Sequence, residues 1–237
     1  MEWSEWQPIY LGIARKLNLN IDSDRKATAL ITTLLMKTDP SSLLTRLEST
    51  IKSRVVVVCG AGPSLERNLN EAIRSPNLTD AIYVAADGAA SAFLELDRTC
   101  DVLVTDLDGD NDDLKRMINR GALPIVHAHG DNIDRVEQFV PTIKETLGST
   151  QVEPTNRAFL WGGFTDGDRA CYIVLSYAPR RLVLAGMDFG TVVGRWSKPN
   201  RDSHYQADRR KRTKLEIARQ LITSLLVRTN VPYNYMT

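Results

Sequence analysis

The sequence has few of the features that would place a protein in a specialised class. Its 237 residues include only three cysteines, Cys59, Cys100 and Cys171, which lie far apart and form no CxxC pair. This spacing predicts neither a disulfide framework nor a zinc site, but three buried thiols. No apolar run approaches the roughly 20 residues of a membrane span, and "MEWSEWQPIY" lacks the basic start and apolar core of a signal peptide. We therefore expect a cytoplasmic protein with no membrane partner.

The sequence also lacks an excess of charge of either sign. Its formal net charge is +1, with 25 % charged and 43 % hydrophobic residues, as in ordinary globular proteins. Overall charge therefore gives no attraction to nucleic acid, and the length suits one main α/β domain with an appendage. A homo-oligomer is compatible with this composition.

Two regions differ in their apolar pattern. Residues 1–52 carry apolar residues at helical spacing, as in "DRKATALITTLLMK", and predict a helical N-terminal region. Residues 53–237 predict an α/β catalytic domain, because six short apolar runs alternate with helical patterns. The runs are "RVVVVC", "AIYVAA", "DVLVT", "LPIVHA", "RAFLW" and "RLVLAG". Their continuous apolar character predicts a Rossmann-like, mostly parallel six-stranded sheet flanked by helices. A long C-terminal helix is expected at about 207–227.

Acidic and glycine-rich segments follow these runs. They begin at Gly60, Asp87, Asp106, His129, Gly162 and Met187, and five of the six contain aspartate soon after the strand. One such segment, "DLDGDNDD", is compatible with a solvated turn. Ligands of open parallel sheets, however, bind beyond the carboxyl ends of the strands. The convergence of carboxylates at that edge therefore predicts a site.

Mg²⁺ is the cation that these carboxylates favour, since it prefers oxygen ligands and leaves positions for substrate phosphates. Asp106 and Asp108 share a face if the chain is still extended there. Without a cation, clustered carboxylates would raise one another's pKa. Zinc is disfavoured, because His127 and His129 are the only nearby soft ligands.

The turn "GAGPSL" (residues 60–65) allows backbone amides and a following helix N-terminus to approach a phosphate. It also resembles the dinucleotide fingerprint G-x-G-x-x-G, although leucine replaces the third small residue. A site for NAD or S-adenosylmethionine, with Asp87 on a ribose, is therefore the competing interpretation. That interpretation leaves several acids without a role, namely Asp106, Asp108, Asp131, Asp166 and Asp168.

Two further features have open interpretations. In "GGFTDGDRA", Asp168 is either a helix cap or a ligand-binding residue, and Arg169 either binds a phosphate or pairs with an acid. The basic block, residues 195–214, is a solvated helix start, a nucleic-acid contact, or a lid over ATP. Nucleic acid is disfavoured, because no aromatic stacking array accompanies the block. The lid residues to test would be Lys198, Arg201 and Lys214.

Six short motifs in this order resemble the archaeal 6-hydroxymethyl-7,8-dihydropterin diphosphokinase (MptE-like) family. They are "GAGPSL" (60–65), "AADGA" (85–89), "VTDLDGD" (104–110), "HGDN" (129–132), "GGFTDGDRA" (162–170) and "LAGMDFG" (184–190). The plan is more distantly similar to the catalytic domain of thiamine pyrophosphokinase. That family's C-terminal β-sandwich has no counterpart in the segment after the long helix, so thiamine is not the expected substrate.

The resemblance implies Mg²⁺-dependent transfer of diphosphate from ATP to the hydroxymethyl group of a reduced pterin, with release of AMP. It implies Mg²⁺ binding by Asp87, Asp106, Asp108 and Asp131. It also implies that Gly60, Gly62 and Ser64 cradle a phosphate, and that Asp166 or Asp168 orients the nucleotide or the alcohol. Arg169 would meet a phosphate, and Asp131 or Asp166 would serve as general base unless a metal-bound alkoxide needs none. Asp188 would either contact the pterin ring or cap the turn after the last strand.

Overall fold

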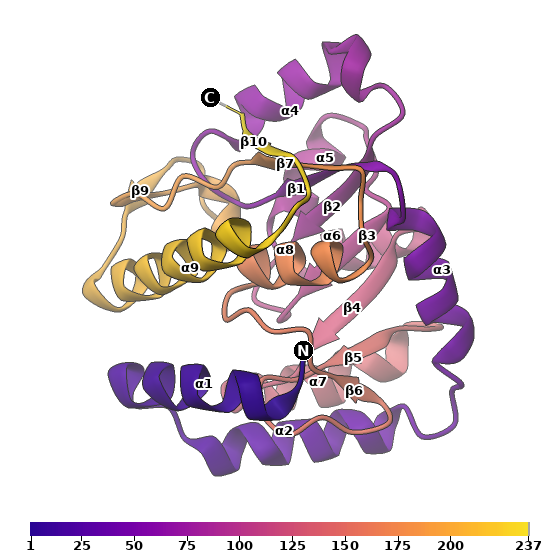
Figure 1. Ribbon diagram of the computed structural model, residues 1–237, viewed down its shortest axis with the longest axis vertical. Helices are drawn as coiled ribbons and strands as arrows, with labels where there is room; N and C mark the ends of the chain where they lie inside the picture. The colour runs from indigo at the N-terminus through magenta and orange to yellow at the C-terminus, as the bar shows by residue number, and fades with distance from the viewer. Residues whose placement is uncertain (237) are drawn as a thin grey trace.

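The apolar runs form the central layer of a three-layer α/β/α fold (Figure 1). The computed structural model describes residues 1–236. Within them, the main sheet has eight strands in the order β10-β7-β1-β2-β3-β4-β5-β6, and all its neighbours are parallel. The strands are β1 (Val55–Cys59), β2 (Ile82–Ala86), β3 (Val102–Thr105), β4 (Leu123–His127), β5 (Leu147–Ser149), β6 (Ala158–Phe159), β7 (Arg181–Ala185) and β10 (Tyr233–Tyr235). Strands β8 (Val192–Val193) and β9 (Tyr205–Gln206) form a separate antiparallel pair.

The predicted parallel sheet is confirmed, but the expected number of strands was two too low. All six apolar runs contain a strand, and β5 and β10 are additional. Strand β5 is only "LGS", and β10 is an exposed "YNY" at the sheet edge. Neither segment has the continuous apolar character by which a buried strand is recognised. Their pairing with β4 and β7 is therefore decided by tertiary contacts.

Helices cover both faces of the sheet. They are α1 (Trp3–Leu17), α2 (Ile21–Leu34), α3 (Ser41–Ile51), α4 (Leu65–Arg74), α5 (Ala89–Glu95), α6 (Asn111–Asn119), α7 (Ile133–Phe139), α8 (Asp166–Ser176) and α9 (Arg209–Arg228). Single 3₁₀ turns are η1 (Pro76–Leu78), η2 (Val140–Thr142) and η3 (Arg195–Ser197). The helical N-terminal region and the long C-terminal helix are confirmed. Within residues 1–236, no helix is both long and apolar enough to cross a membrane.

Alternate residues of the strands point to two separate cores. In β1, Val57 packs with α2, α4, α5, α6 and α7 on one face, whereas Val56 packs with α3, α8 and α9 on the other. Helix α1 lies outside the second face, where its apolar side contacts α8 and α9. Figure 1 shows α1 and α2 near β5 and β6, at the opposite end of the sheet from α4. This two-sided burial explains the continuous apolar runs.

The strand order creates a crevice at the carboxyl end of β1. Successive strands lead from β1 through β2 to β6 on one side, while β7 lies on its other side. The connection from β1 leads to α4 on one face, whereas the connection from β7 leads to α9 on the other. Open α/β sheets bind ligands at such a switch point.

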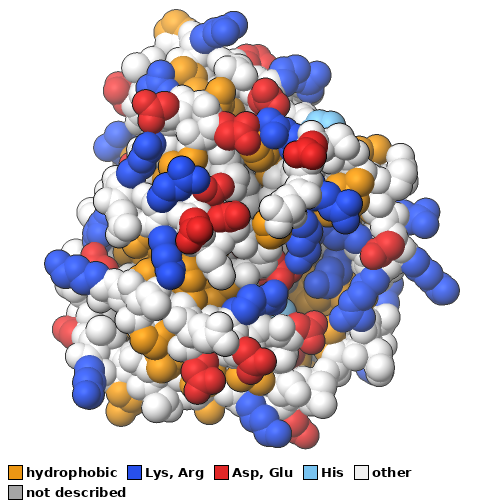
Figure 2. Space-filling view, turned by 180° about the vertical axis from the view of Figure 1, so that it is seen from behind, with side chains coloured by type: hydrophobic (Ala, Val, Ile, Leu, Met, Phe, Trp, Pro, Cys, Tyr) orange, Lys and Arg blue, Asp and Glu red, His pale blue; other side chains and the backbone are white. Residues whose placement is uncertain are grey.

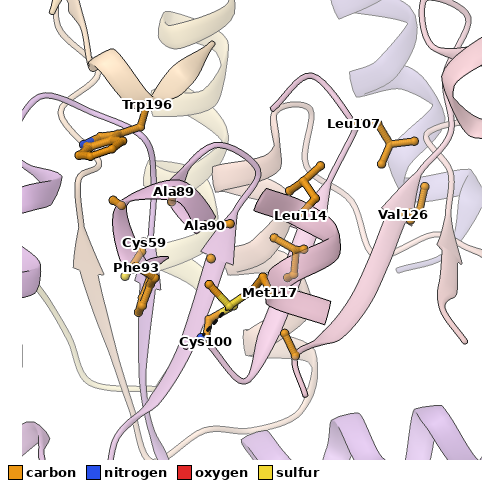
Figure 3. Packing of buried hydrophobic residues seen from close by; sticks show 14 of the residues in the cluster. Cys59, Ala89, Ala90, Phe93, Cys100, Leu107, Leu114, Met117, Val126 and Trp196 are labelled. Carbon is orange, nitrogen blue, oxygen red and sulfur yellow. Dashed lines mark hydrogen bonds between the residues drawn. The ribbon is translucent and has the colours of Figure 1, made fainter. Parts of the chain in front are cut away.

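Leu107 fixes the chain immediately beyond β3. Its side chain is 2 % exposed and belongs to the core cluster that contains Leu114 and Met117 of α6, as Figure 3 shows. To reach that position, Leu107 adopts a left-handed backbone conformation with φ of 64°. One apolar residue thus divides the acidic segment and separates Asp106 from Asp108.

Candidate functional site

A cavity lies beyond the carboxyl ends of the central strands. Its volume is about 210 Å³, whereas one water molecule needs only about 10–15 Å³ by the same measure. The wall combines the start of α2, the loops after β1, β2, β3, β4 and β7, and the first turns of α8 and α9. Figure 2 shows Lys and Arg side chains gathered around a hollow that has acidic side chains within it. The cavity is large enough for a ligand of many atoms.

Three carboxylates, from Asp87, Asp106 and Asp166, form a cluster on the cavity wall. One oxygen from each lies within 4.8 Å of the others. Asp87 directly follows β2, Asp106 directly follows β3, and Asp166 is the first residue of α8. Oxygen ligands of one Mg²⁺ lie at most about 4.2 Å apart, twice the metal–oxygen distance. Small side-chain shifts would therefore let this cluster hold one hard divalent cation.

The three carboxyl groups differ in proton affinity. Burial and then the charge of Asp106 raise the pKa of Asp87 to about 7. Burial, followed by the charges of Asp106 and Asp87, raises the pKa of Asp166 well above its ordinary value. Burial would also raise the pKa of Asp106, but hydrogen bonding and charge from His129, together with the charges of Lys214 and Lys198, outweigh it and lower the pKa to about 2. Asp106 is therefore the member that stays ionised, and a cation would stabilise the other two.

Hydrogen bonds hold this cluster in place. The Thr105 hydroxyl donates to Asp87, and the backbone N–H of Asp108 donates to Asp106 at 3.1 Å. His129 Nε2 lies 3.5 Å from the other Asp106 oxygen. The Asn132 side chain donates to the backbone carbonyl of Asp106 at 2.7 Å. Loops after β3 and β4 thus fix the Asp106 carboxylate from both sides.

Asp108 and Asp131 lie outside this cluster, although both line the cavity. The left-handed turn at Leu107 prevents the extended geometry that would place Asp106 and Asp108 together. Asp108 instead pairs with Arg135 at 2.9 Å and with Lys198. The Asp131 side chain is 70 % exposed, with Arg210 at 3.9 Å. Asp166 takes the place in the carboxylate cluster that we expected for these two residues.

The glycine-rich turn is packed against the loop after β7. The backbone amides of Gly60 and Gly62 donate to carbonyls of residues 185 and 186, at 2.9 and 3.0 Å. The amide and the hydroxyl of Ser64 both donate to Asp188. A Cβ atom on Gly62 would lie 2.1 Å from the Asp188 carboxylate. Close packing therefore requires glycine here, and these three amides are already hydrogen-bonded within the protein rather than free to cradle a phosphate.

Asp168 and Arg169 lie behind the cavity wall. Asp168 is fully buried and completes a capping box with Thr165 at the start of α8, so its helix-cap interpretation fits the structure. Arg169 is also fully buried; it donates to the carbonyl of Gly162 at 3.2 Å and lies 3.0 Å from Nε2 of His127. Its guanidinium is thus held by internal partners, unlike the direct phosphate contact that we expected.

The N-terminal region contributes part of the cavity wall, which the sequence patterns did not indicate. Asp24 of α2 is 4 % exposed and lines the cavity. Its carboxylate accepts hydrogen bonds from the Gly130 amide at 2.6 Å, from Gln151 at 2.8 Å, and from the Tyr10 hydroxyl. Within "NIDSDRK" this acid is indistinguishable from a solvated helix residue. Only the packing of α2 against the loop after β4 gives it a structural role.

The basic block supplies three lysines near the carboxylate cluster. Lys211 and Lys214, in the first turns of α9, line the cavity, and Lys198 pairs with Asp108. Arg201 points elsewhere, with its guanidinium 4.7 Å from the centre of the Tyr205 ring. Lys211 was missed at the sequence level because four of its neighbours in "DRRKRTK" are also basic.

Comparison with known proteins identifies the family of this chain. Residues 33–194 match the family described as 6-hydroxymethylpterin diphosphokinase MptE-like. This chain belongs to that family. Three archaeal relatives carry the name 6-hydroxymethyl-7,8-dihydropterin pyrophosphokinase. The Pyrococcus furiosus protein is 42 % identical over 222 residues, which cover 94 % of this chain and 93 % of the relative.

The other two of these relatives are also similar in sequence over most of this chain. The Methanocaldococcus jannaschii protein is 35 % identical over 233 residues, covering 95 % of this chain and 96 % of the relative. The Methanothermobacter thermautotrophicus protein is 43 % identical over 175 residues, covering 73 % and 74 %. The family resemblance expected from the six motifs is confirmed, and the matched residues 33–194 include all three carboxylates of the cluster.

Proposed function

We propose that this chain transfers diphosphate from ATP to 6-hydroxymethyl-7,8-dihydropterin in a Mg²⁺-dependent reaction that yields AMP and the pterin diphosphate. The observation that carries the proposal is the cluster of Asp87, Asp106 and Asp166 on the wall of a large cavity. Family membership supports the pterin as acceptor. A buried cluster of like charges is costly without a cation, and a hydroxymethyl group is a suitable nucleophile for a bound nucleotide.

Asp87, Asp106 and Asp166 would hold the Mg²⁺, which neutralises charge on the polyphosphate when bound. His129 keeps Asp106 ionised for this purpose, and the Thr105 hydroxyl orients Asp87. The main task of the protein is to align the acceptor hydroxyl with the β-phosphorus. Asp188, held by Ser64 and part of the cavity wall, is the candidate for contact with the pterin ring.

Of the two candidate general bases, Asp166 is the better placed. It lies within the carboxylate cluster, whereas the Asp131 side chain is largely exposed. An oxygen bound to Mg²⁺ is a poor proton acceptor, so this role would fall to the Asp166 oxygen that does not hold the cation.

A site for NAD or S-adenosylmethionine is the weaker interpretation. It would assign Asp87 to a ribose, but Asp87 lies beside two other carboxylates. It would also need free amides in the turn at residues 60–65, where Gly60, Gly62 and Ser64 donate within the protein. The diphosphokinase proposal accounts for both observations.

The decisive experiment is an incubation of the purified protein with ATP, Mg²⁺ and reduced 6-hydroxymethylpterin. Chromatography would separate AMP from ADP, and parallel reactions would contain thiamine, no acceptor, or excess chelator. We expect AMP that depends on both the pterin and Mg²⁺. Absence of AMP across several nucleotide donors would refute the proposal, and AMP formed with thiamine alone would assign a different acceptor.

A further inference from the structure

Three ammonium groups from the basic block gather beside the carboxylate cluster. Lys211 and Lys214 lie one turn apart on α9 and both line the cavity, where Lys214 lies 6.0 Å from the centre of the Phe164 ring. Lys198 lies on the segment between η3 and β9 and pairs with Asp108. Lys211 donates to the Ser197 hydroxyl at 3.1 Å, which links α9 to that segment. Two separate elements thus bring cations to one wall.

The three lysines repel one another, and the charges of Lys214 and Lys198 also act on the carboxylate cluster, where they lower the pKa of Asp106. Burial and then the charges of Lys214 and Lys198 lower the pKa of Lys211, although Asp166 and Asp106 act in the opposite sense. Neither Lys211 nor Lys214 forms an ion pair among the described residues. Like charges held together at a cavity wall indicate a site for an anion, because binding sites often hold residues in placements that cost the free protein stability.

The remainder of the cavity offers few other groups to an anion. The amides of Gly60, Gly62 and Ser64 are already hydrogen-bonded, and the negative charge of Asp188 lies at the start of α4. Arg169 is enclosed by protein atoms. The positive charge that a polyphosphate needs must therefore come mainly from the α9 side, together with any cation held by the carboxylates.

We infer that Lys211 and Lys214, with Lys198 as a third cation, form a polyphosphate-binding site that faces the carboxylate cluster. This inference rests on the proposed function for the identity of the nucleotide, but the site itself requires only a phosphate chain. All three lysines lie beyond residues 33–194, the part that matches the family. The lysine ammonium groups would bind the phosphate oxygens directly, so these residues would contact the substrate.

Inorganic tripolyphosphate is the probe that tests this site without requiring any reaction. Calorimetric titrations with and without Mg²⁺ would compare the full-length protein with Lys211→Met and Lys214→Met. Each substitution removes a charge-assisted contact, so we expect affinity to fall by about tenfold or more, with a larger loss in the double variant. Arg212→Met is the matched control, because Arg212 is exposed on the same turn and does not line the cavity. Unchanged affinity in both lysine variants would overturn the inference.

Two further measurements separate substrate contact from a structural role. Methionine supports a helix nearly as well as lysine, and the lost hydrogen bond to Ser197 is offset by relief of repulsion between the lysines, so Lys211→Met should melt close to the temperature of the parent. Lys211→Arg should retain most of the tripolyphosphate affinity. A lower melting temperature in Lys211→Met, with tripolyphosphate affinity retained, would show that the residue is structural and contradict the inference.

These experiments distinguish failure of the polyphosphate-site inference from failure of the proposed reaction. If the parent protein forms no AMP but Lys211→Met loses tripolyphosphate binding, the polyphosphate site stands and the diphosphokinase assignment fails. If the parent forms pterin-dependent AMP while the lysine variants bind tripolyphosphate and ATP normally, the reaction stands and this inference fails.

Discussion

Ser64 donates two hydrogen bonds to the same carboxylate oxygen of Asp188, from its backbone N–H at 3.1 Å and from its hydroxyl at 3.0 Å. This pair joins the loop after β1 to the loop after β7 at the switch point of the sheet. The start of α4 is therefore occupied by a carboxylate of the protein itself. A substrate phosphate would be repelled there, and we therefore propose that a neutral, hydrogen-bonding ring binds at this end of the cavity.

Asp188→Asn tests that assignment. Asparagine can still accept the Ser64 hydrogen bonds but lacks the charge that favours the guanidine-like edge of a pterin. We expect KM for the pterin to rise about tenfold, with KM for ATP unchanged. Steady-state kinetics with each substrate varied in turn would measure both. A rise in the KM for ATP alone would place the nucleotide, rather than the pterin, at this end.

Asp106→Asn and Asp166→Asn should each lower the rate of AMP formation by about 100-fold or more, because each removes a charged ligand from the cation site. Mg²⁺ titration should show weakened binding, while circular dichroism stays unchanged. Asp112→Asn is the control, since Asp112 is an exposed acid of the same segment. Equal activity in all three variants would exclude the cluster from the reaction.

The metal-free protein should lose the stabilising contribution of Asp87 as the pH rises from about 4 to about 7.5. Burial and the charge of Asp106 raise the pKa of Asp87 to about 7, above its ordinary value of 3.8. A carboxyl group with a raised folded-state pKa contributes stability below its unfolded pKa, and this contribution is lost as pH passes its folded pKa. Melting curves in chelator should show this fall, and Mg²⁺ should reduce it.

Asp87→Asn provides the control for that titration, because it removes the shifted group and its part of the pH dependence. His127 acts in the opposite sense within this window, since burial and the charge of Arg169 lower the pKa of His127 well below its ordinary value, but this effect is common to both proteins. That group costs stability only as the pH falls below about 6.5. A difference in melting temperature between the parent and Asp87→Asn that stays constant from about pH 4.5 to 7.5 would contradict the prediction.

Asp24→Ala should destabilise the protein by about 3–5 kcal/mol, because it leaves buried donors from Tyr10, Gln151 and Gly130 without their acceptor. Tyr10→Phe removes only one of these bonds and should cost about 1.5–3 kcal/mol. Urea denaturation would measure both. If Asp24→Ala cost no more than Tyr10→Phe, the carboxylate would not be the centre of this network.

Gly88→Ala should destabilise the packing of α5 against η3. Its Cβ atom would lie 1.8 Å from the carbonyl oxygen of Trp196, and a backbone atom cannot rotate away. We expect a cost of about 1–3 kcal/mol. Gly12→Ala is a matched control, because no atom lies within 4 Å of a Cβ at that position of α1. There, alanine should stabilise by about 0.5–1 kcal/mol. If the denaturation midpoints of Gly88→Ala and Gly12→Ala moved in the same direction, the prediction would be contradicted.

Local sequence patterns were sufficient for the framework of this protein. The six apolar runs predicted strands because burial on both faces requires continuous apolar side chains, and those runs became β1, β2, β3, β4, β6 and β7. The six motifs predicted the family, and the aspartates after successive parallel strands predicted one acidic edge. Asp87, Asp106 and Asp166 were all named in advance. Short β5 and exposed β10 were missed, because their pairing depends on neighbours rather than on their own residues.

Only the tertiary structure decided how those residues are grouped. The left-handed turn that buries Leu107 separates Asp108 from Asp106, and the capped start of α8 brings Asp166 in its place. The packing of the loop after β7 engages the amides of residues 60–65, and the docking of α9 brings Lys211 to the cavity. Spacing along the chain specifies which residue types follow each strand. Distances between side chains depend on backbone turns and on the packing of distant elements, which the sequence pattern does not specify.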